Sequence, residues 1–278
     1  MKANNIAISI PYKGCDKKCP YCVSLMTGEV KTDNILFERN LEKAKYIAQS
    51  SAVSSVSITG KGEPFLNIEA MGKVVNVFKH MPIEVQTNGR LLKKLFNSRI
   101  IGRYNALIAQ LSYIDIFAFS CDTFEEITDL KDVIENLNSH GFITRITFNV
   151  TDRVSDKTYS DFLNVFKEVG VRQFSFRKIT KANFTEENEV HKWIDEHGGA
   201  DIYERLISQG EKYITENNCQ MIRKLSYGAV LYDVDGMSYT YFDYCIQDTS
   251  DEGDVRSLIY QEDGHLYTTW NSPASLVF

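Results

Sequence analysis

Six segments with the character of β-strands alternate with helix-like segments, and this alternation limits the fold more than any other feature of the sequence. Each segment is short, rich in β-branched or aromatic residues and mostly ends at a polar residue. They are residues 6–10, 53–59, 83–87, 114–120, 143–150 and 173–178. Repeats of this kind build a parallel sheet covered by helices. Because there are six repeats and not eight, we expect an open, partial (β/α)6 TIM-like barrel.

Amphipathic periodicity predicts the covering helices. One apolar stripe lies at Phe37, Leu41, Ala44 and Ala48. A second, preceded by a capping box of Thr123 and Glu126, lies at Ile127, Leu130, Ile134 and Leu137.

The pattern changes after about residue 186, so we predict a core domain over 1–185 and a C-terminal α+β extension over 186–278. Two helical stretches, near 187–197 and 201–217, lead into a tail that repeats Tyr-x-x-Asp-Gly-x-x-Tyr-Thr at 232–240 and 260–268. Asp-Gly favours hairpin turns, because glycine tolerates a positive φ. We therefore expect two β-hairpins that cover or flank the barrel and help to close its mouth. A dimerisation surface is the alternative.

Three cysteines, Cys15, Cys19 and Cys22, are spaced Cys-x3-Cys-x2-Cys after the first strand. Three thiolates can hold three irons of a cubane [4Fe–4S] cluster and leave the fourth iron open for chemistry. Structural zinc needs four ligands, and the next candidates, His80 and Cys121, are distant in sequence, although a distant residue could close such a site. Cysteines this crowded suit a metal better than disulfides.

Composition describes an ordinary globular protein, with 43% hydrophobic and 24% charged residues. No run approaches the roughly 20 apolar residues of a membrane span, and the first residues do not resemble a signal peptide. We therefore expect a cytoplasmic protein that acts away from membranes. The net charge of −6 counts against nucleic acid as a partner.

The cysteine spacing, with Tyr21 before the last cysteine, resembles the signature of the radical S-adenosylmethionine (SAM) superfamily. The resemblance implies an enzyme with one [4Fe–4S] cluster whose open iron binds SAM. Reductive cleavage of SAM would give a 5′-deoxyadenosyl radical that abstracts hydrogen from a substrate, with the protein supplying binding and orientation. It also implies an electron donor such as flavodoxin or ferredoxin.

Two further motifs look like SAM-binding elements of that superfamily. Residues 60–64 read Gly-Lys-Gly-Glu-Pro and resemble its Gly-Gly-Glu-Pro element, which implies that Gly62, Glu63 and Pro64 orient the SAM amino group. Residues 87–89, Thr-Asn-Gly, resemble a third-strand motif and add Asn88 to the SAM pocket.

The remaining SAM contacts are expected where the strands end, since functional loops sit at the C-terminal edge of such sheets. We expect Tyr21 at the adenine, Ser120 and Asp122 at the ribose, Asn149 at the carboxylate or ribose, and Arg177 at the carboxylate. The alternatives are packing for Tyr21, helix capping for Asp122 and a structural salt bridge for Arg177. All these positions are predicted on one rim, and no catalytic residue is assigned.

The substrate is less constrained than the cofactors. Residues 62–66 and 118–124 look like the corresponding stretches of viperin-like enzymes, which act on a nucleotide triphosphate. We therefore expect a small-molecule substrate, a nucleotide or other metabolite. The alternatives are modification of a peptide or protein, including glycyl-radical activation, and a non-enzymatic zinc or Fe–S binding module.

The other cysteines, Cys121, Cys219 and Cys245, form no second Cys-x2-Cys group, so we expect one cluster.

Overall fold

The computed structural model describes residues 1–28, 31–97, 111–182, 185–224, 229–242, 255–270 and 272–278. Two compact units are interleaved in the sequence. The first unit comprises Met1–Lys18, Val23–Phe117 and Ile246–Phe278, and the second comprises Cys19–Cys22 and Ala118–Cys245. Each is described by itself. The predicted division at residue 185 stays a prediction.

The first unit contains the first three predicted strands and a hairpin from the C-terminal tail. Its described elements are β1 (Ala3–Ser9), α1 (Val23–Thr27), α2 (Asn34–Ser50), β2 (Ser55–Thr59), η1 (Pro64–Asn67), α3 (Ile68–Phe78), β3 (Ile83–Thr87), α4 (Arg90–Asn97), β10 (Val255–Tyr260), β11 (Leu266–Tyr267) and η4 (Pro273–Ser275). The strand order is β11-β10-β1-β2-β3, and only β11 runs antiparallel to its neighbour.

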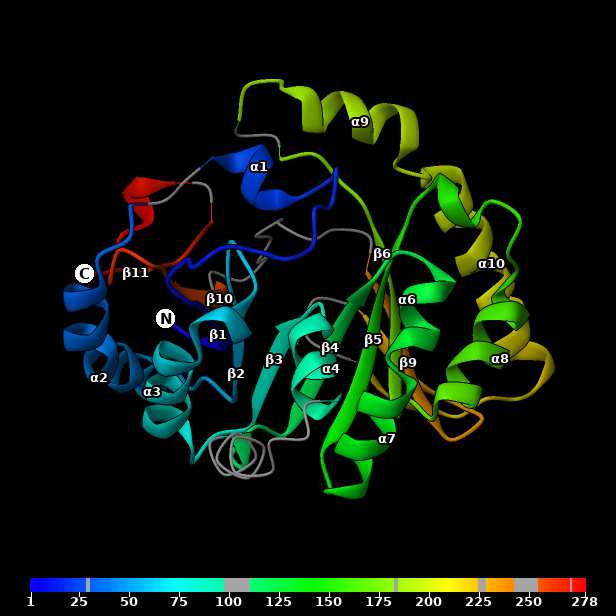
Figure 1. The fold of residues 1–278 in the computed structure, drawn as a ribbon, viewed down its shortest axis with the longest axis horizontal. Helices are drawn as coiled ribbons and strands as arrows, with labels where there is room; N and C mark the ends of the chain where they lie inside the picture. Colours follow the sequence, from blue (N-terminus) through cyan, green and yellow to red (C-terminus); the bar gives the residue numbers. More distant parts are fainter. Residues whose placement is uncertain (29–30, 98–110, 183–184, 225–228, 243–254, 271) are drawn as a thin grey trace. The chain divides into compact units, whose positions relative to one another are not determined.

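Helix α2 packs against β1 and α3 (Figure 1). Its buried residues are Phe37, Leu41, Ala44 and Ala48, which confirms the predicted stripe. Asp33 caps this helix, because its side chain accepts a hydrogen bond from the backbone N–H of Leu36 at 2.9 Å.

The second tail hairpin extends the edge of β1 in the first unit. Strand β10 pairs with β1 in parallel and with β11 in antiparallel orientation. The turn passes so close to α2 that a Cβ on Gly264 would lie 2.6 Å from the backbone of Leu36 and Phe37. Gly264 also has a φ of +76°, so both the space and the backbone conformation require glycine.

The second unit contains the remaining predicted strands, the other hairpin and most of the helices of the C-terminal half. Its elements are α6 (Phe124–Asp129), α7 (Lys131–Ser139), β5 (Ile143–Val150), η2 (Asp152–Val154), α8 (Tyr159–Val169), β6 (Gln173–Lys178), α9 (Glu189–His197), α10 (Ala200–Glu216), β7 (Met221–Lys224), β8 (Val230–Val234) and β9 (Met237–Phe242). Strand β4 (Ile116–Cys121) begins in the first unit and ends in the second.

Strands β5, β6 and β9 run parallel, and β8 and β7 continue the sheet antiparallel. The first tail hairpin therefore joins β6 through β9. Its turn residues, Asp235 and Gly236, have φ of 54° and 81°, as a type I′ turn requires. Both predicted hairpins are present, and each extends a sheet edge.

The core of the second unit is aromatic on one face of β5 and β6. Phe148 and Phe176 pack edge-on against Phe162 of α8, with ring centroids 4.7 and 4.9 Å apart. Helices α8 and α10 lie side by side against this part of the sheet (Figure 1). The opposite face is polar, since Thr147 and Ser175 are register partners whose hydroxyls are 3.3 Å apart.

One predicted helix is broken in two. The stripe after Thr123 is divided between α6 and α7 at Leu130, and its apolar residues remain buried. Thr123 accepts from the Glu126 N–H as predicted, but the Glu126 carboxylate accepts from the N–H of Asp122, not from that of Thr123. The reciprocal capping box is therefore incomplete, because the glutamate reaches one residue further back.

The open α/β fold with two tail hairpins is confirmed. The six predicted strands are all present, with ends displaced by at most three residues. Neither run of strands closes on itself. Among the described residues, no helix combines the length and apolar character needed to cross a membrane.

Candidate functional site

The three cysteines of the motif lie in irregular backbone between β1 and α1. None of the three forms a disulfide with a described residue; Cys15 is exposed, and Cys19 and Cys22 are half-buried. The N–H of Cys22 donates to the carbonyl of Cys19 at 3.2 Å, which makes that end of the loop a turn. Within the described residues, no three metal-ligating side chains are already gathered into one group. The donor set nevertheless fits a cubane cluster, because it offers three accessible sulfurs, the ligand that such clusters use.

In the first unit, the Gly-Lys-Gly-Glu-Pro loop lies directly against the cysteine loop. The N–H of Glu63 donates to the carbonyl of Gly14 at 3.0 Å. A Cβ on Gly62 would lie 2.2 Å from that carbonyl oxygen and 2.9 Å from the ring of Tyr12. Gly62 is therefore required for these two loops to approach each other.

Glu63 connects the ends of β2 and β3. Its carboxylate is 5% exposed and accepts hydrogen bonds from Thr87 Oγ1 at 2.7 Å, the Asn88 N–H at 2.9 Å and the Phe65 N–H at 3.2 Å. Burial raises the pKa of Glu63, and these hydrogen bonds oppose the shift. Pro64 begins η1, where a missing N–H costs nothing.

Asn88 lies beside the first cysteine. Its Nδ2 donates to Asp16 Oδ1 at 2.8 Å and lies 3.9 Å from Cys15 Sγ. The first unit therefore brings together Cys15, Glu63 and Asn88, as predicted separately from three motifs. Sequence reasoning missed Asp16 and the role of Thr87; the Thr-Asn-Gly motif was the available signal for Thr87.

In the second unit, Tyr21 is buried and packs against Trp193 of α9, with ring centroids 5.6 Å apart. Burial raises the pKa of Tyr21 strongly, and the negative charge of Asp122 adds to the shift. This placement is the packing alternative for Tyr21, and its contact with adenine stays a prediction. Nothing in the sequence pattern pointed to Trp193.

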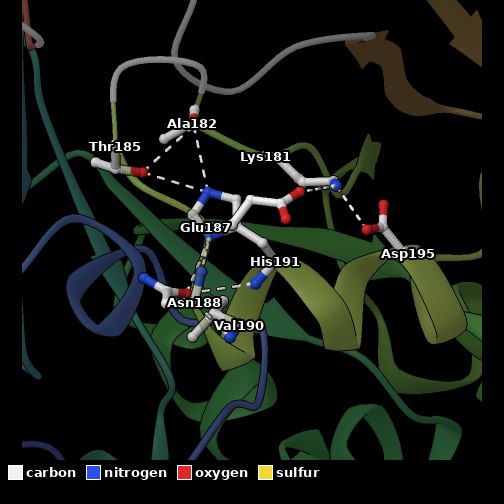
Figure 2. A network of polar contacts seen from close by, with 8 residues as sticks. All are labelled: Lys181, Ala182, Thr185, Glu187, Asn188, Val190, His191 and Asp195. Atoms are coloured by element: carbon white, nitrogen blue, oxygen red, sulfur yellow. Dashed lines mark hydrogen bonds and ion pairs between the residues drawn. The ribbon is translucent and has the colours of Figure 1, made fainter.

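A polar network fixes the start of the helix that carries Trp193 (Figure 2). The buried ring of His191 has Nε2 3.2 Å from Thr185 Oγ1, and Nδ1 3.0 Å from Asn188 Oδ1. Lys181 donates to Asp195 at 2.6 Å. These contacts set the position of α9 and so of Trp193.

Asp122, predicted at the ribose, is nearly fully buried and forms an ion pair with Arg153 at 2.9 Å. Ser120 is half-buried near the end of β4. Asn149 and Arg177 are register partners on β5 and β6, so their side chains share the polar face of the sheet. Among the described residues, the Arg177 side chain has no ion-pair or hydrogen-bond partner, although the backbone of Arg177 is paired within the sheet. Asn149 is 8% exposed.

Comparisons with known proteins agree with these motifs. The family model described as a 4Fe-4S single cluster domain matches residues 6–122. These residues are similar to a domain of the radical SAM type. The single cluster and SAM are therefore the cofactors of the chain, as the motifs predicted. Of the other cysteines, Cys121 is buried, Cys219 is half-buried, and Cys245 lies outside the described residues.

Two curated relatives of the chain have names that refer to nucleotides. The GTP 3′,8-cyclase of Clostridium acetobutylicum is 25% identical over 213 residues, which are 71% of this chain and 61% of the relative. The S-adenosylmethionine-dependent nucleotide dehydratase RSAD2 of Siniperca chuatsi is 28% identical over 121 residues, 41% of this chain and 30% of the relative. The faint viperin-like similarity is thereby confirmed. The chain spans less than two thirds of either relative.

Solved structures of radical SAM enzymes share the fold of this chain. SuiB of Streptococcus suis gives a TM-score of 0.59 at 15% identity, covering 97% of this chain and 60% of that one. The structure titled anSMEcpe with bound AdoMet gives 0.56 at 14% identity, covering 99% of this chain and 77% of that one. These likenesses cover nearly the whole chain, including its C-terminal part.

Proposed function

We propose that the chain is a radical SAM enzyme that acts on a nucleotide or another small metabolite. One observation carries the proposal: Gly62 allows the Glu63 N–H to reach the backbone carbonyl of Gly14, in the loop that carries Cys15. A loop fit for SAM and a loop fit for a cluster are thus in direct contact. When bound, the cluster and SAM supply a 5′-deoxyadenosyl radical that abstracts hydrogen from the substrate.

The chain's own residues would hold these groups. Cys15, Cys19 and Cys22 supply three thiolates. Asn88 offers an amide N–H near Cys15 Sγ, and hydrogen bonds to ligand sulfur are one means of setting a cluster's potential. Because the Glu63 carboxylate already has three donors and room for about four, it can accept one further N–H, such as the SAM amine.

The other residues that we predict to contact SAM lie within the second unit and are considered there by themselves. The Arg177 guanidinium beside the Asn149 amide suits a carboxylate, which can take both N–H groups of an arginine at once. Ser120 stays a candidate for the ribose. The Asp122 carboxylate already pairs with Arg153, so it would have to contact the ribose while it keeps that ion pair. Tyr21 would meet the adenine only through the part of its ring that Trp193 leaves free.

The substrate class is supported by the two relatives named for nucleotide chemistry. We also propose a cytoplasmic enzyme with a protein electron donor, since free thiols and a reduced cluster require a reducing compartment. The alternative, a peptide substrate, is supported by the likeness to SuiB, whose structure was solved with its precursor peptide SuiA. That likeness concerns the fold.

A substrate screen tests the proposal. The anaerobically reconstituted protein is incubated with SAM, dithionite and either nucleoside triphosphates or synthetic peptides, and 5′-deoxyadenosine is measured. We expect at least one nucleotide to raise the release of 5′-deoxyadenosine above the substrate-free background. That nucleotide should also be converted to a product. Stimulation by peptides alone would favour the alternative. A protein that binds zinc, with no release under any condition, would favour a non-enzymatic module.

A further inference from the structure

Positive charge is concentrated beside the first cysteine of a chain whose net charge is −6. Residues 12–18 and 88–95 contain six Lys or Arg and a single acidic residue, Asp16. We call the six cations the basic patch: Lys13, Lys17, Lys18, Arg90, Lys93 and Lys94. Because the whole chain is acidic, a positive field at this place is not a consequence of overall composition.

The first unit holds the two segments of the basic patch together through Asp16. Arg90 Nη1 donates to the Asp16 carbonyl at 3.0 Å, and Lys94 Nζ lies 3.7 Å from Asp16 Oδ2. Asp16 therefore joins the two segments, since its backbone carbonyl accepts from Arg90 and its carboxylate pairs with Lys94, both of α4. The Lys94 side chain is 70% exposed, and Lys13, Lys18 and Arg90 are also exposed.

The basic patch surrounds features that suit contact with another protein. Cys15 is exposed and lies in sequence between Lys13 and Lys17. Tyr12, directly before Lys13, is 54% exposed although its ring lies over Gly62. Exposed aromatic side chains are enriched where proteins bind each other.

We propose that the basic patch is the docking surface for a small, acidic one-electron carrier protein, of the flavodoxin or ferredoxin class. This inference rests on the proposed function, which needs one electron for each SAM cleaved. The carrier loses one electron and the cluster gains it, with no proton or leaving group involved. Complementary charge speeds encounter and orients the carrier with its redox centre toward the exposed side of Cys15.

Charge-reversed variants test the surface. Lys18→Glu/Lys94→Glu alters two exposed patch cations, and Lys192→Glu/Lys212→Glu makes the same change in net charge elsewhere, at side chains that are 63% and 72% exposed. Binding of a purified flavodoxin to each reconstituted protein is measured by calorimetry at several salt concentrations. We expect the patch variant to lose about tenfold or more in affinity and most of its salt dependence, and the control variant to bind like the native protein.

The same proteins are assayed for 5′-deoxyadenosine with flavodoxin and with dithionite. We expect the patch variant to be slow only with flavodoxin. Equal flavodoxin binding by both variants would overturn the proposal. So would loss of nucleoside triphosphate binding with flavodoxin binding retained, which would assign the patch to substrate phosphates.

If the reversed charge near Asp16 disturbs the loop, Lys18→Gln/Lys94→Gln is measured with Lys192→Gln/Lys212→Gln. Absence of dithionite-driven cleavage in the native protein would contradict the proposed function, while the binding comparison still decides the surface.

Discussion

At the scale of single residues, Glu63 has two predicted roles, one in stabilising the loop and one in binding SAM, and a substitution can distinguish them. Glu63→Ala leaves buried donors of Thr87, Phe65 and Asn88 without their acceptor, so we expect about 1–3 kcal/mol of lost stability. It should also weaken SAM binding while iron content stays nearly unchanged. Denaturant unfolding, calorimetry and iron analysis measure the three effects. Unchanged SAM affinity would make Glu63 a loop residue only.

Glu63 also makes stability depend on pH in a defined direction. Its folded pKa is raised above the ordinary value of 4.5, so the folded state holds the proton more tightly than the unfolded state. Stability from this group is present below pH 4.5 and is lost as the pH rises through the raised folded pKa. The unfolding free energy of the apoprotein should therefore fall with rising pH relative to that of Glu63→Gln. A constant difference between the two proteins would contradict the assigned shift.

Gly62 offers a purely steric test of the contact between the two loops. Gly62→Ala places a methyl group 2.2 Å from the Gly14 carbonyl oxygen, and we expect about 1–3 kcal/mol of destabilisation and weaker iron retention. Gly72→Ala in α3 is the matched control, because no described atom lies within 4 Å of its added Cβ. The control should gain about 0.5–1 kcal/mol. Equal thermal unfolding and iron content of the two variants would refute the close approach.

At the scale of elements, local patterns predicted most of the secondary structure. The stripe Phe37, Leu41, Ala44 and Ala48 is the buried face of α2, because a helical period places those residues on one side. The Asp-Gly turns were equally local. The partners of the tail strands were not predictable, since pairing of β10 with β1 joins segments about 250 residues apart and depends on which sheet edge is free.

Glu262, in the second tail hairpin, is an example of such a distant effect. It is 1% exposed and accepts from the Tyr12 N–H at 2.8 Å, Thr32 Oγ1 at 3.1 Å and Ser9 Oγ at 3.4 Å. The hairpin thereby anchors the start of the cysteine loop. We expect Glu262→Ala to lose about 1–3 kcal/mol and much of its iron, and Glu262→Gln, which keeps one carbonyl acceptor, to retain most of both.

Asp263→Asn is the control for Glu262. Its carboxylate contacts Tyr267 and the His265 N–H, which belong to the same hairpin. Iron content after reconstitution and thermal unfolding are measured for both variants. Loss of iron that exceeds the loss of stability would show that Glu262 anchors the cysteine loop. If Asp263→Asn lost as much iron as Glu262→Ala, the hairpin would matter only as a whole.

At the scale of the whole molecule, the sequence predicted the fold class and the cofactors better than the site. The cysteine and glycine motifs are each contiguous in the sequence, so the cofactors that they bind can be predicted from the sequence alone. Contacts such as Tyr21 with Trp193, or Asp122 with Arg153, join residues far apart in the chain and had no local signal. The substrate depends on such distant side chains, which is why the motifs specify SAM chemistry without naming what it acts on. The closing of the barrel mouth by the tail hairpins stays a prediction.

The central claim is that this chain uses a three-cysteine cluster to cleave SAM. The most direct measurement quantifies iron, 5′-deoxyadenosine and methionine after anaerobic reconstitution with SAM and dithionite, for the native protein and for the triple variant Cys15→Ala/Cys19→Ala/Cys22→Ala. We predict about four irons per native chain, as a cubane contains, with both products in equal amounts, and neither iron nor products in the variant. A full cluster retained by the variant, or a loaded native protein that releases no 5′-deoxyadenosine, would contradict the account.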